Sequence, residues 1–131
     1  MRNRVRGLAV LAWLAFAPGA ALACGACVED KVAAVYDHGV AEGAARHGHR
    51  VAFLALDGPL VAGERSRRAV FEALARSRGV DRATVRVSIE NAACAAAFDP
   101  ARTSAAAIAA ELGRRLAPIG ITAAPLDVQA N

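Results

Sequence analysis

The stretch RVAFLALDG, residues 50–58, limits the folds open to this chain more than any other feature. Its composition is typical of a β-strand that closes at Asp57-Gly58. Successive strand residues point to opposite faces of a sheet, and here both alternating sets are apolar. The sets are Val51, Phe53 and Ala55 on one side and Ala52, Leu54 and Leu56 on the other. A strand that is apolar on both faces predicts a sheet that is covered on both sides.

Five further segments follow in an order that defines a fold class. They are helix 64–79, strand 84–91, strand 92–99, helix 104–120 and strand 121–128. Glu90-Asn91 predicts a two-residue hairpin turn, Thr103 is placed to cap the second helix, and Pro125 indicates an edge strand because proline cannot donate to a ladder. The order strand, helix, strand, strand, helix, strand predicts an α+β fold, the ferredoxin-like βαββαβ sandwich.

One amphipathic helix is expected ahead of this unit. Residues 28–46 repeat apolar residues at helical spacing, with Glu29 and Asp30 in the first turn, where the helix dipole favours acids. We predict that this helix ends near His47. The chain then turns tightly into strand 50–58, so the helix should lie antiparallel to that strand along the sheet. It is the one element left to cover the second face of strand 50–58.

The first 23 residues have the layout of a secretory signal. An arginine-rich start precedes an apolar run that a Pro-Gly pair interrupts, and small residues stand at Ala21 and Ala23. Cleavage there would leave Cys24 as the first residue with a free amino group. Lipidation of Cys24 is the less favoured alternative, since lipoprotein signals usually have a large aliphatic residue where this chain has Ala21. We expect a periplasmic or secreted protein with no stable membrane insertion once the signal is removed.

Charge and composition exclude several classes of partner. The chain has 16 basic and 12 acidic residues, but the signal holds three of the arginines, which leaves 13 against 12. So balanced a surface, with 5% aromatic residues, does not predict nucleic-acid binding. Scattered carboxylates and the lack of a glycine-rich phosphate loop give no support to hydrolytic or transfer chemistry.

From residue 50 onward the sequence resembles the heavy-metal-associated (HMA) domains of copper chaperones and metal-pumping ATPases. The resemblance covers about residues 50–128 and rests on LDG before a helix ending in RSRGV, on a strand pair ending in FDP, and on PIGITAAPLD. It implies a ferredoxin-like fold in which Leu54 and Leu56 face the two helices. It does not supply metal ligands, because the family's Gly-Met-x-Cys-x-x-Cys loop corresponds here to GPLVAGE, residues 58–64, which has no cysteine.

Cys24 and Cys27 form the chain's one closely spaced thiol pair, CGAC. Two soft thiolates at this spacing suit Cu(I), whereas tetrahedral zinc would need two more ligands. The same pair in an oxidising compartment is also typical of a disulfide, either structural or redox-active, and CGAC is similar to the thioredoxin-type motif. The sequence therefore leaves metal binding, disulfide formation and lipidation of Cys24 open, with metal binding favoured.

The remaining metal-ligating residues have plain structural interpretations. His38 lies about 16 Å along a helix from Cys27, so the two do not form a compact site. His47-Gly48-His49 is either a second, weak site for Cu(II) or zinc or, as we favour, a helix end with Gly48 left-handed. Cys94 alternates along its strand with other apolar residues and is predicted to point into the core.

Three domains follow from these patterns: signal peptide 1–23, a Cys-x-x-Cys-bearing helix at 24–49, and an HMA-like ferredoxin-fold domain at 50–131. The predicted function is an exported soft-metal carrier or scavenger, not an enzyme, that holds copper through Cys24 and Cys27. Its partner would be a metal-transport protein or a cuproprotein. The alternatives are a thiol-disulfide oxidoreductase that uses the same pair and a metal-free interaction domain.

One spatial prediction joins the two halves of the chain. A helix over 28–46 spans roughly 28 Å and strand 50–58 about 26 Å, so an antiparallel return matches their lengths. Cys24 and Cys27 should then come back to the end of the sheet near loop 58–63. In the family that the sequence resembles, this loop holds the metal-binding cysteines.

Overall fold

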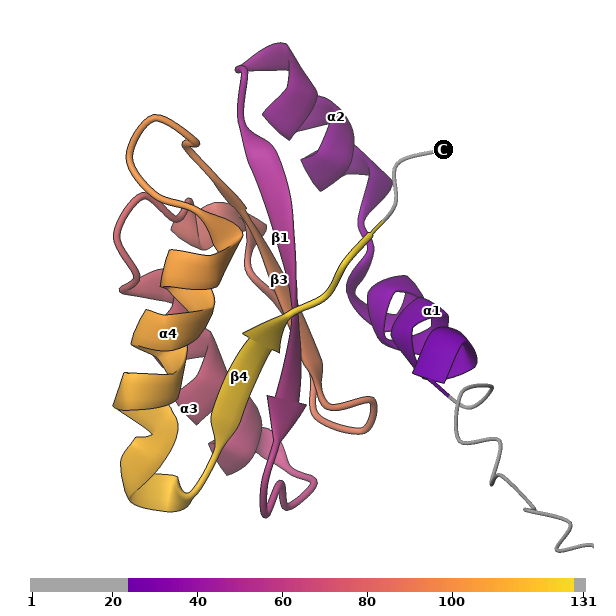
Figure 1. Cartoon of the computed structure of the whole chain (residues 1–131), viewed down its shortest axis with the longest axis vertical. Helices are drawn as coiled ribbons and strands as arrows, with labels where there is room; N and C mark the ends of the chain where they lie inside the picture. The colour runs from indigo at the N-terminus through magenta and orange to yellow at the C-terminus, as the bar shows by residue number, and fades with distance from the viewer. Residues whose placement is uncertain (1–23, 129–131) are drawn as a thin grey trace, which may run out of the picture.

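The structure, a computed structural model, describes residues 24–128 and consists of a four-stranded antiparallel sheet with helices on both faces (Figure 1). The strands are β1 (Arg50–Asp57), β2 (Arg86–Ser88), β3 (Ala93–Phe98) and β4 (Thr122–Pro125), in the order β2-β3-β1-β4. α3 (Glu64–Ala75) joins β1 to β2, and α4 (Ala105–Leu116) joins β3 to β4. This is the ferredoxin-like βαββαβ arrangement, so the predicted fold class is confirmed.

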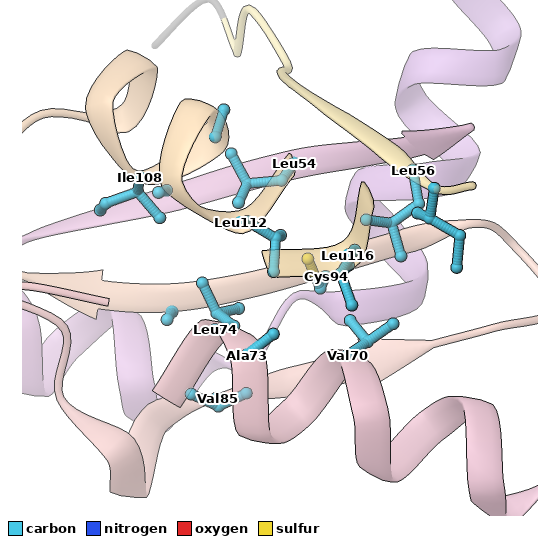
Figure 2. Packing of buried hydrophobic residues seen from close by; sticks show 14 of the residues in the cluster. Leu54, Leu56, Val70, Ala73, Leu74, Val85, Cys94, Ile108, Leu112 and Leu116 are labelled. Atoms are coloured by element: carbon cyan, nitrogen blue, oxygen red, sulfur yellow. The ribbon is translucent and has the colours of Figure 1, made fainter. Parts of the chain in front are cut away.

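The main core lies between the sheet and the pair α3 and α4. Leu54 of β1, Leu74 of α3 and Leu112 of α4 meet there with no exposed surface (Figure 2). Val85, Cys94 and Ile108 join the same cluster, as their periodicity predicts. Burial of a large aliphatic side chain contributes about 1.5–3 kcal/mol, so this cluster dominates the stability of the fold.

The second face of the sheet carries α1 (Cys24–Val35) and α2 (His38–Arg46). Val35 packs there against Ala93 and Ala95 of β3, with Val51 and Phe53 of β1 beside it. The prediction that the N-terminal segment covers this face is therefore confirmed.

The prediction of one continuous helix over 28–46 was wrong. α1 begins at Cys24, four residues earlier than expected, so Glu29 lies in its second turn. The helix stops at Val35, because Asp37 is extended and its side-chain oxygen accepts a hydrogen bond from the Val40 amide at 3.1 Å. This is an N-cap, which begins a new helix and ends the preceding one.

Two local details also differ from the sequence predictions. The residue that caps α4 is Ser104, whose hydroxyl accepts from the Ala107 amide, and not Thr103. The β2–β3 turn spans four residues, 89–92, where two were predicted. It closes through a hydrogen bond from the Ala92 amide to the Ile89 carbonyl, with Ala92 at φ 48°. β4 is an edge strand, as Pro125 indicated.

Asp37 is expected to stabilise the packing of α2 on the sheet. Asp37→Ala removes both the N-cap and the partner of Arg86, whereas Asp37→Asn keeps a capping oxygen and loses the charge. Urea unfolding should therefore rank stability as wild type, then Asn, then Ala. The two bonds hold the pKa of Asp37 below its usual value, the Val40 amide more than Arg86.

The same lowered pKa sets the pH dependence. The contribution of Asp37 is present above the ordinary carboxyl pKa and is lost as the pH falls through the lower value of the folded state. Equal stability of all three proteins at neutral pH would contradict this role.

Candidate functional site

The Cys-x-x-Cys pair lies in the first turn of α1, which begins at Cys24. The side chains of residues 24–27 lie outside the described part of the structure, as does the whole predicted signal, 1–23. The site is therefore built here from the backbone of α1 and from the side chains that hold this helix to the sheet.

Lys31 fixes the position of α1 along the sheet. Its ammonium nitrogen donates to the carbonyl oxygens of Asn91 at 2.8 Å and Ala92 at 3.2 Å, in the turn between β2 and β3. The Ala92 carbonyl also accepts from the Leu56 amide of β1 at 2.8 Å. α1 is thus tied to the end of the sheet where β1 terminates.

Loop 58–63 leaves the sheet at this same end, directly after Asp57. Cys27 precedes Lys31 by one helical turn, a rise of about 6 Å. Lys31 therefore ties α1 to the end of the sheet from which loop 58–63 leaves. The placement of the Cys-bearing turn beside that loop stays a prediction, as do the positions of the two sulfur atoms.

Loop 58–63 itself offers no soft ligand. Gly58 adopts φ 130°, and a Cβ there would clash with the Gly120 carbonyl, so the loop packs closely against the chain that follows α4. Val61 at its tip is 71% exposed. The nearest ionisable residues in sequence are Asp57 and Glu64, whose carboxylates are hard oxygen ligands that do not suit Cu(I).

His47 and His49 lie at the opposite end of β1 from the turn that binds Lys31. His47 and His49 precede the first residue of β1, and the strand's eight residues span about 26 Å. His38 begins α2, where its Nε2 lies 3.5 Å from a carboxylate oxygen of Glu42. Among the side chains that the structure describes, no three His, Cys, Asp or Glu residues are grouped so that they could hold a metal ion.

Cys94 is a core residue. It has no exposed surface, and burial raises the pKa of its thiol to about 12. A thiol that stays protonated and out of contact with solvent is neither a ligand nor a nucleophile at neutral pH. This agrees with its predicted inward orientation.

Sequence reasoning missed the ion pair that anchors the start of α2. Arg86 of β2 donates to Asp37 Oδ2 through Nε at 3.0 Å and lies 2.9 Å from it through Nη2. Its Nη1 donates to the carbonyls of Ala83 and Val85. An aspartate directly before the helical segment HGVAEGAAR was an available N-cap signal in the sequence. Its partner Arg86, 49 residues away, could not be identified in this way.

No family model and no curated protein matches the sequence. Among solved structures, the crystal structure of oxidized MerP from Ralstonia metallidurans CH34 is similar at 22% identity with a TM-score of 0.47, over 60% of this chain and 99% of that one. Within residues 24–128, no helix has the length and apolarity needed to cross a membrane.

Cys94 provides a test of the division between core and site. Cys94→Ala should lower the free energy of unfolding by on the order of 1 kcal/mol, because it removes one buried sulfur atom. Metal stoichiometry should not change. Loss of metal binding on this substitution would make Cys94 a ligand and would contradict its burial.

Lys31 provides a test of how α1 is held. Lys31→Met removes the donor to the Asn91 and Ala92 carbonyls, and amides over 28–35 should then exchange with solvent faster while those of β1 and β3 do not change. Lys31→Arg keeps a cationic donor and serves as the matched control. Unchanged exchange in Lys31→Met would show that Val35 alone holds the helix.

Proposed function

We propose that this protein is an exported soft-metal carrier or scavenger that binds Cu(I) between the thiolates of Cys24 and Cys27. Two thiolates suffice for a low-coordinate cuprous ion, so the chemistry needs no third protein ligand. The acceptor or donor would be a metal-transport protein or a cuproprotein. The chain would act as a carrier and not as an enzyme.

The contact of Lys31 with the β2–β3 turn is the observation that carries this proposal. It ties α1 to the β2–β3 turn one helical turn beyond Cys27, so the motif belongs to a helix that the sheet holds. Val35 supports the same placement from the other end of the helix. The pair would then stand at the end of the sheet occupied by loop 58–63, the loop in which HMA domains keep their own cysteines.

Two features of the chain agree with a thiol site at this position. Lys31 follows Cys27 by four residues on a continuous helix, so its charge would favour thiolate over thiol, while Glu29 and Asp30 would oppose that effect. Cys94, the one cysteine whose side chain the structure describes, is buried and does not compete for metal.

Native mass spectrometry of the reduced, exported protein titrated with Cu(I) and with Zn(II) tests the proposal. One Cu(I) per chain is expected, with Zn(II) held more weakly because two of its four ligand positions lack a protein donor. The Cys24→Ser, Cys27→Ser double variant should lose Cu(I), and Cys94→Ala is the matched control that should keep it.

Two results would contradict the carrier proposal. One is a double variant that binds Cu(I) with unchanged affinity. The other is a diacylglyceryl adduct on Cys24 in the intact mass, which would remove that thiol. Turnover of disulfide substrates, with a reduction potential near that of the compartment, would instead favour the oxidoreductase in which Cys24 attacks and Cys27 resolves.

A further inference from the structure

The structure brings His47 and His49 together at the end of the sheet opposite to the turn that binds Lys31. Both line an open groove of about 450 Å³ between α2 and the sheet, which Gly43, Ala44 and Asp81 also line. Their ring centres lie 6.3 Å apart with the planes tilted by 44°.

The backbone fixes this pair. α2 ends in a Schellman motif, in which the His49 amide donates to the Ala44 carbonyl at 2.8 Å and the Gly48 amide to the Ala45 carbonyl at 3.2 Å. Gly48 at φ 68° reverses the chain between the two histidines. Because this motif is made by main-chain bonds, the spacing of the two Cα atoms does not depend on a ligand.

The protonation of one ring can be assigned from its partner. His47 Nδ1 lies 2.7 Å from the Gly43 carbonyl oxygen, and since a carbonyl can only accept, Nδ1 carries the proton. In the neutral ring, Nε2 then keeps a free lone pair. Metal-binding histidines are commonly oriented in this way, by donation from the other ring nitrogen to a backbone carbonyl.

From this geometry we propose that His47 and His49 form a site for a borderline divalent cation, Cu(II) before Zn(II), whose remaining positions are filled by water. With metal–nitrogen bonds of about 2 Å, two rings have centres roughly 5 Å apart on tetrahedral Zn(II) and about 4.5 Å apart at adjacent positions of tetragonal Cu(II), so closure by about 1–2 Å is needed. His47 is exposed and His49 half-buried, which leaves room for this rotation. Imidazole favours Cu(II) over the other divalent ions of the first row.

The surrounding charges make the site weak. Arg46 and Arg50 are exposed beside the two histidines in sequence and oppose a cation. Asp81 across the groove offsets this in part, while the charge of Asp37 is paired with Arg86. The site is independent of the proposed thiol site, since the length of β1 separates them.

Titration with Cu(II) in a non-coordinating buffer tests the proposal, using the full protein with Cys24→Ser and Cys27→Ser so that thiols neither bind nor reduce the ion. Electron paramagnetic resonance should show nitrogen ligation of one Cu(II). His47→Gln and His49→Gln should each weaken binding about tenfold or more, because even the loss of a supporting hydrogen bond at a metal site costs that much.

His38→Gln is the matched control, since His38 lies at the other end of α2, and it should leave Cu(II) affinity unchanged. Circular dichroism of each variant confirms that the fold is kept. Unchanged affinity in the His47→Gln, His49→Gln double variant would overturn the site, and so would an equal loss in His38→Gln. Because the thiols are absent throughout, neither result bears on Cu(I) binding by Cys24 and Cys27.

Discussion

The structure depends on the apolar character of β1 on both of its faces. Leu54 and Leu56 anchor the sheet to α3 and α4, while Val51 and Phe53 present a second apolar surface on the other side. Left in water, that surface would forgo on the order of 1 kcal/mol or more for each large side chain. Val35 covers it, so the N-terminal helices are part of the folded unit.

The neighbouring strand makes this double cover sterically feasible. β3 reads ACAAAF and is buried along its whole length. Its alanines contribute little apolar area themselves but let helices approach the sheet closely from both sides. The large side chains that fill the core therefore come mainly from the helices and from β1, as Figure 2 shows for Leu74, Ile108 and Leu112.

The two ends of the sheet differ in the donors that the chain brings to them. Soft sulfur donors are proposed for the end where Lys31 ties α1 to the β2–β3 turn, and imidazole nitrogens lie at the end where α2 passes into β1. The Asp37–Arg86 pair stands between them and fixes the junction of α1 and α2 to β2. The same short segment that covers the second face thus positions both sets of donors.

Local periodicity was enough to predict the order of the elements, the two-faced strand β1, the inward Cys94 and the edge position of β4, because each depends on neighbours within a few residues. Tertiary contacts decided the rest. The break before α2 is held by Arg86, and the position of the Cys-bearing helix by carbonyls of Asn91 and Ala92, sixty residues from Lys31. No pattern along the chain records such partners, since a lysine or an aspartate can pair with many groups and only the packed sheet brings one of them within reach.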